Sequence, residues 1–373
     1  MTRIYLIRHA EAEGNLYRIA QGQHNSLLTD RGWRQVRALE KRFADIHIDA
    51  VYSSDLYRTC ATASALYKPK GLPLQRSAAL REICVGKWEQ CTWGDIYRED
   101  PEQMRLFSTD PARWYVEGGE DPRMLLERIM REVRRIAAEN EGKTVAVFSH
   151  GYAIRVLLAT LQGYAMEEIG KSPTGDNTAV SLLESGPDGL QVVFRDDNSH
   201  LKTAEYLANE KTFRRANALE PGLRFEPMHL TEQEAFFAEL VASTWEESGE
   251  RRPFDRAALL AGMVGRTTLV GYSVNEPVGL IQIAVEQNIG WITLLCVNQP
   301  LRERGYGIQL VGQAVMHTRD AGGEFLRIAL PKEGMAMKFL TDYGFYAVEN
   351  AGERVVLEKD IRFESEYLGD FQL

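Results

Sequence analysis

The sequence predicts an α/β domain followed by a smaller α+β domain with a mostly antiparallel sheet. In the first 200 residues, short apolar runs alternate with longer stretches whose apolar residues recur at helical spacing, which is typical of strands connected by helices. From residue 267 onwards, three strand-like runs follow one another with short turns between them, which is typical of antiparallel pairing. The chain has 373 residues, of which 44% are hydrophobic, and single cores rarely extend beyond about 250–300 residues.

Strand-like runs organise the first half, at residues 3–8, 50–52 and 144–148, with a hairpin over 180–194. Several helices between them begin at a residue whose side chain can accept hydrogen bonds from the free N–H groups of the first turn. These candidate caps are Thr29 or Asp30, Ser54 or Asp55, and Asp121. The polar stretch 92–110 contains scattered aromatic residues and is expected to form a helical lid.

Two histidines have the same relation to a strand. His9 and His150 each follow a short apolar run, so in one parallel sheet their imidazoles would meet in the crevice beyond the strands' carboxyl ends, where ligands bind. Arg8 and Arg58 also lie where a strand ends or in the helix turn that follows. Two histidines and two arginines, without a cluster of Cys or Asp, suit a phosphate dianion better than a metal, because the planar guanidinium matches phosphate oxygens.

A series of short motifs over residues 1–200 resembles the histidine phosphatase superfamily, which has the phosphoglycerate mutase-like fold. The motifs are Arg8-His9-Ala10-Glu11, Asn15, Gln21-Gly22, Leu28-Thr29 with Gly32, Ser53-Ser54-Asp55-Leu56 with Arg58-Thr59, Leu80-Arg81-Glu82 with Gly86 and Trp88-Glu89, Gly118-Gly119-Glu120 and Ser149-His150-Gly151. The resemblance implies a three-layer α/β/α sandwich. The family usually has Gly where Ala10 stands, and the small Ala side chain is expected to be tolerated.

The resemblance also implies catalytic roles. His9 would be the nucleophile that becomes phosphohistidine. Arg8, Arg58 and His150 would hold the transferring phosphoryl group and its negative charge. Glu82 matches the position of the general acid, which would protonate the leaving alcohol and then activate water.

Three further residues are expected to bind substrate. Asn15 would supply a hydrogen bond, and Gln21 and Gly22 lie in the same polar loop. For Gln21, ordinary packing of the loop is an equal alternative. Neither a metal nor a cofactor is expected in this half.

The domain boundary is expected at the turn Pro221-Gly222, which divides the chain into a phosphatase domain over 1–205, a linker or terminal helix over 206–222 and a second domain over 223–373. In the second domain, a glycine-containing loop follows the third strand and leads at once into a helix, an arrangement that suits a pyrophosphate. This loop resembles the acetyl-CoA loop of the GNAT N-acetyltransferases, and the resemblance covers about 223–360. It implies acetyl-CoA as cofactor, held by Val297, Arg302, Glu303, Arg304, Gly305, Tyr306 and Gly307.

The second half departs from the GNAT pattern at a catalytic position. GNAT enzymes often have a Tyr directly after the Phe of the last helix, as general acid, but here Leu340 follows Phe339. Acetyl transfer to an amine is therefore less secure than cofactor binding, and Tyr343 is the alternative proton donor.

Composition limits the classes of function, bound group and cellular location that fit the chain. The net charge of −9 argues against non-specific binding to nucleic acid or to an anionic membrane. The four cysteines form no C-x-x-C pair, which fits neither a disulfide framework nor a zinc site and is typical of a reducing cytosol. No run approaches the roughly 18 apolar residues that span a bilayer, and the apolar residues before Arg8 are too few for a signal peptide, so a cytoplasmic location is expected.

The sequence thus predicts a phosphomonoesterase for a small phosphorylated metabolite, fused to an acetyl-CoA-binding domain that acetylates an amine. One alternative is a phosphoglycerate mutase. Another is a catalytically idle phosphatase fold that serves the acetyltransferase half as a sensor. The natural phosphoester, the acetyl acceptor and the oligomeric state stay open.

Overall fold

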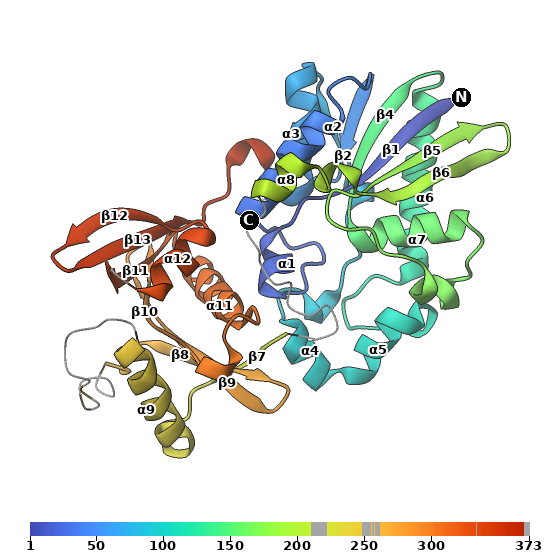
Figure 1. Ribbon diagram of the computed structural model, residues 1–373. Helices are drawn as coiled ribbons and strands as arrows, with labels where there is room; N and C mark the ends of the chain where they lie inside the picture. The colour runs from blue at the N-terminus through green and yellow to red at the C-terminus, as the bar shows by residue number, and fades with distance from the viewer. Residues whose placement is uncertain (210–221, 248–254, 256, 258–261, 333, 369–373) are drawn as a thin grey trace.

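A computed structural model describes residues 1–209, 222–247, 255, 257, 262–332 and 334–368. Each half of the chain builds one sheet, and the two halves lie side by side (Figure 1). Most of the predicted linker over 206–222 lies outside the described residues.

The first half is built on a six-stranded sheet with the strand order β3-β2-β4-β1-β5-β6. Its strands are β1 (Thr2–Arg8), β2 (Ala50–Ser53), β3 (Leu74–Arg76), β4 (Thr144–Ser149), β5 (Val180–Gly186) and β6 (Gly189–Asp197). The first four strands run parallel, and the hairpin of β5 and β6 closes one edge in antiparallel pairing. Arg8 of β1 pairs with Ser149 of β4, so His9 and His150 leave the sheet at the same level.

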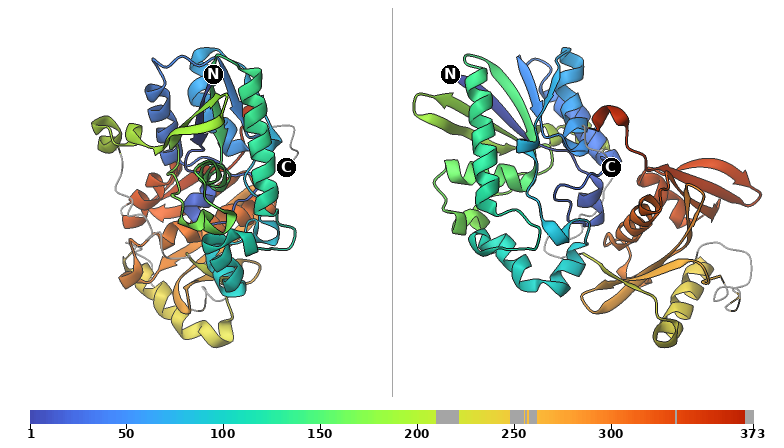
Figure 2. Two further views of the ribbon diagram at one scale, coloured as in Figure 1. Left: turned by 90° about the vertical axis from the view of Figure 1, so that its right-hand side faces the viewer. Right: turned by 180° about the vertical axis from the view of Figure 1, so that it is seen from behind.

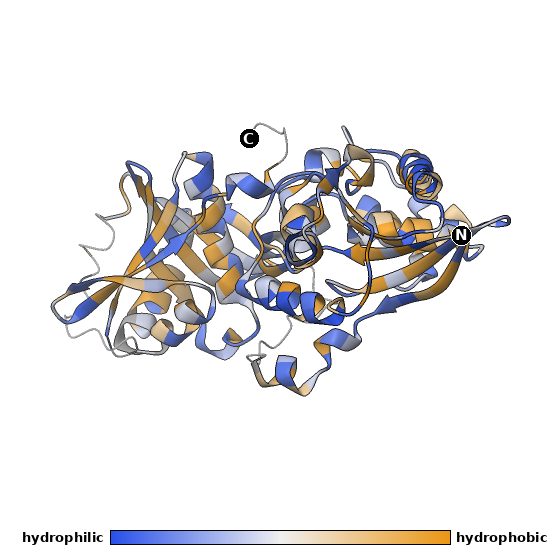
Figure 3. Ribbon diagram, turned by 90° about the horizontal axis from the view of Figure 1, so that it is seen from above, coloured by the Kyte–Doolittle hydropathy of each residue, from blue (hydrophilic) through white to orange (hydrophobic). Residues whose placement is uncertain are grey.

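Helices cover both faces of this sheet (Figure 2). One face packs against α2 (Asp30–Arg42) and α3 (Tyr57–Lys70), and the other against α6 (Pro122–Glu139) and α7 (Gly151–Leu161). Because the central strands are buried on both faces, they are continuously apolar, as Figure 3 shows. The predicted three-layer sandwich is confirmed.

Two helix caps were predicted correctly and one was not. The backbone N–H of Gly32 donates to Thr29 Oγ1 at 3.0 Å, and that of Arg123 donates to Asp121 Oδ1 at 2.7 Å. The prediction that Ser54 or Asp55 caps α3 is wrong, because the N-cap residue is Leu56 and makes no side-chain cap. The carboxylate of Asp55 instead pairs with Arg81, and the hydroxyl of Ser54 contacts His150.

Shorter helices complete the first half. The predicted polar loop after β1 contains α1 (Glu13–Tyr17), and the expected helical stretch over 92–110 forms α4 (Trp93–Glu99) and α5 (Pro101–Thr109). The chain leaves this half through α8 (Ala204–Asn209). Aromatic rings join α5 to α7, since Phe107 stacks on Tyr152 with 4.6 Å between ring centroids.

The second half is built on a seven-stranded sheet with the order β12-β13-β11-β10-β9-β8-β7. Its strands are β7 (Arg224–Pro227), β8 (Thr267–Ser273), β9 (Glu276–Glu286), β10 (Ile289–Val297), β11 (Phe325–Pro331), β12 (Tyr346–Ala351) and β13 (Arg354–Asp360), and its helices are α9 (Leu230–Glu247), α11 (Tyr306–Asp320) and α12 (Met335–Asp342). Only β10 and β11 pair in parallel. The predicted α+β domain with a mostly antiparallel sheet is confirmed.

The two halves share a buried interface between α1 and α11. A Cβ atom at Gly312 of α11 would lie 2.5 Å from the ring of Tyr17, so only glycine allows this close packing. Beside it, Arg319 donates to both carboxylate oxygens of Glu13, at 2.7 and 3.1 Å. Burial lowers the pKa of Arg319, but the carboxylate of Glu13 more than offsets that effect, so the pKa lies above its ordinary value.

The C-terminal segment 361–368 also returns to the first half (Figure 1). The ring centroid of Tyr57 on α3 lies 5.2 Å from that of Phe363 and 5.6 Å from that of Tyr367. Lys68 donates to the hydroxyl of Tyr367 at 2.8 Å. The second half is therefore tied to the first at both α1 and α3.

The interface pair gives a stability prediction. Arg319→Met should lower the free energy of unfolding by about 3 kcal/mol, because it leaves the carboxylate of Glu13 buried without its partner. Urea denaturation of the full chain measures the change. Arg105→Met, which breaks an exposed pair with Glu102, is the matched control and should leave the midpoint in place. Equal midpoints for both variants would contradict the role given to the interface pair.

Candidate functional site

The two predicted site histidines lie side by side beyond the carboxyl ends of β1 and β4. Their ring centroids are 5.4 Å apart, and the residues are 3% (His9) and 0% (His150) exposed. The parallel register of β1 and β4 creates this proximity, because equivalent positions on both strands end in a histidine.

His9 is held as a neutral imidazole. Its Nδ1 lies 2.7 Å from the carbonyl oxygen of Ala10, which can only accept, so Nδ1 carries the proton and Nε2 carries the lone pair. Burial, followed by the charges of Arg58 and Arg8, lowers the pKa of His9 well below its ordinary value. The imidazole is therefore uncharged at neutral pH. Ala10 is fully buried, and its backbone N–H donates to Thr62 Oγ1 at 2.9 Å. The fold therefore accommodates Ala where the family usually has Gly.

Arg58 is a buried cation without a counter-ion. It is 1% exposed and donates to two carbonyl oxygens, those of His24 at 2.8 Å and Gly22 at 2.7 Å. Its Nε is buried without a hydrogen-bond partner among the described residues, and Glu82 and Glu89 act on it through their charges. Burial lowers the pKa of Arg58 to about 10, so the group still carries its charge at neutral pH.

Arg8 is held in a similar way. Its Nη1 donates to the carbonyl oxygen of Gly175 at 2.6 Å, while its Nε is buried without a partner. Burial lowers the pKa of Arg8, and the charge of Glu82 partly offsets that effect. The Nε–H groups of Arg8 and Arg58 are therefore both buried without a hydrogen-bond acceptor among the described residues, and an anion could supply one.

Glu82 lies at the N-terminus of α7. Its Oε1 accepts from the backbone N–H groups of Ile83 at 3.0 Å and Ala153 at 2.9 Å, and its Oε2 accepts from Tyr152 at 3.0 Å. Glu82 is also the largest carboxylate influence on the pKa values of both Arg8 and Arg58, so it belongs to the same charged group. Among the described residues, Oε2 accepts one hydrogen bond and Oε1 accepts two.

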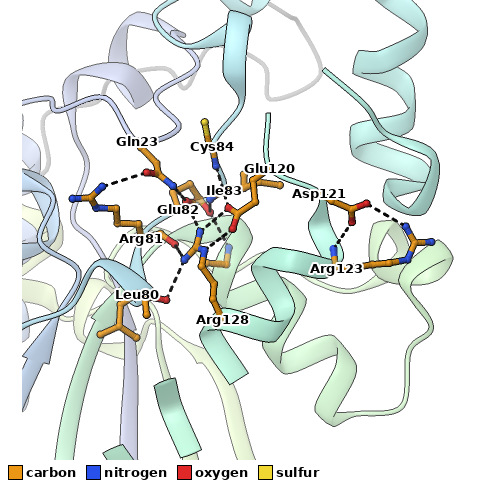
Figure 4. Close-up of polar contacts among 12 residues, drawn as sticks. Gln23, Leu80, Arg81, Glu82, Ile83, Cys84, Glu120, Asp121, Arg123 and Arg128 are labelled. Carbon is orange, nitrogen blue, oxygen red and sulfur yellow. Dashed lines mark hydrogen bonds and ion pairs between the residues drawn. The ribbon is translucent and has the colours of Figure 1, made fainter. Parts of the chain in front are cut away.

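A second layer of side chains fixes the segment that carries Glu82 (Figure 4). Arg128 of α6 donates to the carbonyl oxygens of Ala79, Arg81 and Glu82 at 2.8–3.1 Å, and pairs with Glu120. The sequence shows Arg128 only as one more charged position on an amphipathic helix, and nothing in its local pattern distinguishes it. The neighbouring Arg81 is held by Asp55 through two hydrogen bonds, of 2.6 and 2.5 Å.

The predicted substrate-binding residues differ in what they contact. Asn15 Oδ1 accepts from the N–H of Ala12 at 3.0 Å, which leaves the amide NH2 group as its donor toward a ligand. Gly22 acts through its carbonyl oxygen, which holds Arg58. The side chain of Gln21 accepts a hydrogen bond from Ser26 at 2.6 Å and packs against Gly14. These contacts fit the alternative that Gln21 packs the loop.

His200 supports the loop beside His9. Its Nε2 lies 3.0 Å from Thr178 Oγ1, and its Nδ1 lies 3.2 Å from Arg42 Nη1. The N–H of Thr178 in turn donates to the carbonyl oxygen of His9 at 3.3 Å. Burial, followed by the charge of Arg42, lowers the pKa of His200 to about 4.

In the second half, the sheet opens where the predicted cofactor loop begins. The parallel pairing of β10 with β11 ends at Ile292 and Ile328, although β10 continues to Val297 and β11 to Pro331. The loop that follows turns through Glu303 and Gly305, with φ values of 62° and 82°, and α11 starts directly after it. Arg302 Nε donates to the carbonyl oxygen of Val297 at 3.1 Å and so closes the loop on its own strand.

The loop residues offer backbone rather than side-chain groups. Tyr306 is buried in the core, with its hydroxyl 3.3 Å from Ser273 Oγ. Gly307 leaves room for the ring of Phe339, which a Cβ atom would approach to 3.1 Å. The first N–H groups of α11 have no partner within the helix and can bind an anion. Arg304 lies in the same turn.

Neither the usual general-acid position, Leu340, nor the alternative donor, Tyr343, is well suited to supply a proton. Leu340 is fully buried in the core and carries no proton to give. Tyr343 follows the end of α12, and burial raises its pKa to about 12. It lines a cavity of about 1220 Å³ between the halves, which also reaches Arg8, Asn15 and Gly305.

Comparison with known proteins assigns the first half to a family. The model of the histidine phosphatase superfamily (branch 1) matches residues 4–198, which is 195 of the 373 residues. The chain belongs to this superfamily. The model of the acetyltransferase (GNAT) family matches residues 234–345.

Several similar proteins each match about half of this chain. Phosphoserine phosphatase 1 of Hydrogenobacter thermophilus is 29% identical over 49% of this chain and 86% of its own length. The adenosylcobalamin/alpha-ribazole phosphatase of Escherichia coli is 28% identical over 44% of this chain and 81% of its own length. The solved structure of YhfR from Bacillus stearothermophilus superposes with a TM-score of 0.53 at 29% identity, covering 54% of this chain and all of that one. Homologues named as phosphatases make this chain an enzyme of the histidine phosphatase family.

Among the described helices, none combines the length and apolar character that crossing a bilayer requires.

The buried histidines predict an acid-sensitive fold. In the unfolded chain they titrate near their ordinary pKa of about 6.5, whereas the folded-state pKa values of His9, His150 and His200 are lower. As the pH falls below about 6.5, the unfolded chain takes up protons that the folded chain does not, so stability falls; above that pH these groups contribute nothing. His200→Gln should reduce the loss between pH 6.5 and 5 by about 2 kcal/mol.

Urea denaturation at each pH measures this effect, with exposed His47→Gln as the control. An unfolding free energy for the wild type that does not change from pH 7 to pH 5 would contradict the account.

Proposed function

We propose that the first half hydrolyses a phosphomonoester of a small metabolite through a phosphohistidine intermediate. The observation that carries this proposal is the buried pair of cations beside a neutral histidine. Arg8 and Arg58 each keep one buried N–H without a protein partner, and a phosphate dianion supplies both the charge and the acceptor oxygens.

In the first step, the lone pair of His9 Nε2 forms a bond to phosphorus. The bond between phosphorus and the ester oxygen breaks, and that oxygen leaves with its bonding electrons and takes a proton from Glu82. Arg8 and Arg58 hold the equatorial oxygens, where negative charge spreads during transfer. The fixed positions of Glu82 and His9 make both groups available without rearrangement.

In the second step, Glu82 takes a proton from water as the water oxygen attacks phosphorus. The nitrogen–phosphorus bond breaks, its electrons return to His9 Nε2, and inorganic phosphate leaves. Glu82 is protonated again and His9 is neutral again. The two residues thus end as they began.

Hydrolysis is favoured over the mutase reaction, although one similar protein, from Salmonella choleraesuis, is named a probable phosphoglycerate mutase GpmB, with 29% identity over 76% of its length. A mutase must keep its phosphoenzyme from water, which in this family goes with extra segments around the site. Here the match to the family ends at residue 198. Interconversion of 3- and 2-phosphoglycerate faster than phosphate release would favour the mutase instead.

The idle alternative, a sensor without turnover, is disfavoured by the complete set of catalytic side chains. His9, Arg8, Arg58, Glu82 and His150 are all present, and His9 is held in the tautomer that a nucleophile needs. A sensor would need the anion-binding groups but not the general acid.

His9→Ala should lower kcat for para-nitrophenyl phosphate at least a thousandfold, because no other described group at the site can form the phosphoenzyme. Release of para-nitrophenol measures turnover, and acid-labile phosphate on wild-type His9 measures the intermediate. His47→Ala, which removes an exposed histidine, should retain full activity. Wild-type turnover by a folded His9→Ala protein would overturn the proposal.

For the second half, we propose that acetyl-CoA binds at the opening between β10 and β11, with its pyrophosphate at the N-terminus of α11. The separated strands and the free helix N–H groups support this placement. When bound, acetyl-CoA supplies an acetyl group for an amine. Neither Leu340 nor Tyr343 is placed as an ordinary proton donor, so transfer is expected to be slow or restricted to an unusual acceptor.

Gly305→Glu should abolish acetyl-CoA binding measured by isothermal titration calorimetry, because the added side chain fills the space and brings a negative charge toward the pyrophosphate. Gly322→Glu is the matched control, since Gly322 has a similar φ of 78° but follows the far end of α11. The control should bind acetyl-CoA as the wild type does. Absence of binding by the wild type at millimolar acetyl-CoA would refute the proposed site.

A further inference from the structure

The hydroxyl group of Ser54 contacts the ring of His150 inside the phosphoryl site. Ser54 follows the last residue of β2, is fully buried, and has its Oγ 2.8 Å from His150 Nε2. Its N–H donates to the carbonyl oxygen of Phe148 at 2.9 Å, which fixes the serine relative to β4. Ser54 therefore contacts His150 instead of capping α3.

The direction of the contact follows from counting protons. The backbone N–H of Leu56 donates to Ser54 Oγ at 3.3 Å, so the hydroxyl oxygen already accepts one hydrogen bond. Its own proton needs an acceptor, and among the described residues the one acceptor in contact with this oxygen is His150 Nε2. Ser54 therefore donates to Nε2.

A neutral imidazole that accepts at one nitrogen carries its proton on the other. His150 then has its proton on Nδ1, and that atom is buried without a protein partner. A buried N–H group without an acceptor is costly, by about 1–3 kcal/mol. The ring lies beside the nucleophile His9, so a phosphoryl oxygen bound there is the acceptor that completes the arrangement.

We propose that Ser54 is a positioning residue that holds His150 in the Nδ1–H tautomer, so that His150 donates a hydrogen bond to the phosphoryl group. This inference rests on the proposed phosphatase function and deepens it. Without the hydroxyl group, the other tautomer becomes available, and its Nδ1 lone pair would face the phosphoryl oxygens and repel them.

The first test is kinetic. Ser54→Ala should lower kcat/KM for para-nitrophenyl phosphate about tenfold, which corresponds to about 1.4 kcal/mol, and should weaken inhibition by inorganic phosphate by a similar factor. Ser54→Thr keeps the hydroxyl group and should restore most of the activity. Ser53→Ala is the matched control, because Ser53 is equally buried but donates to the carbonyl oxygen of Ser54 at 2.7 Å rather than to His150.

The second test reads the tautomer directly. Nitrogen-15 spectra of the ring nitrogens, assigned with a His150→Gln variant, should show Nδ1 protonated in the wild type and a shift toward protonated Nε2 in Ser54→Ala. Protonated Nε2 in the wild type, or equal losses of activity in Ser54→Ala and Ser53→Ala, would overturn the inference. If the wild type hydrolyses no phosphoester, the proposed function fails, while the spectra still decide whether Ser54 sets the tautomer.

Discussion

The parallel pairing of β1 with β4 is the constraint on which the phosphoryl site depends. Hydrogen bonding between these strands runs without a register shift from Arg3 with Thr144 to Arg8 with Ser149. A slip of one residue would turn the apolar side chains of β1 to the opposite faces and would separate the two histidines. The strand pairing that stabilises the sheet therefore also brings His9 and His150 together.

The site carries buried positive charge, on Arg8 and Arg58, that no ion pair among the described residues neutralises. Two arginines are held by carbonyl oxygens instead of carboxylates, and both flank a histidine that burial keeps neutral. Glu82 has the largest carboxylate influence on the pKa values of both arginines, and its hydrogen bonds to the N-terminus of α7 keep it near them without an ion pair. In the proposed reaction, the charge of the phosphate ester completes the arrangement, so that substrate binding and charge neutralisation occur together.

The sequence was informative where the chemistry is local. Arg8, His9 and His150 follow directly from strand ends, and the caps of α2 and α6 follow from Thr29 and Asp121. Ser54 and Arg128 were missed because their partners lie 96 and 46 or more residues away, at His150 and in the Glu82 segment. The sequence predicts a loop where α1 lies, since five residues are too few to show helical periodicity. In the second half, the sequence pattern does not predict β11, β12 or β13. The contact of residues 361–368 with α3 has no local sequence signal.

The interface between α1 and α11 has a consequence for biosynthesis. Glu13 leaves the ribosome 306 residues before its partner Arg319, and at 5–20 residues per second that interval lasts roughly 15–60 s. During this time the nascent first half carries Tyr17 and Ile19 uncovered, although both belong to the core of the second half in the finished protein. Tyr17 therefore reaches its final burial against Gly312 only after nearly the whole chain has been synthesised.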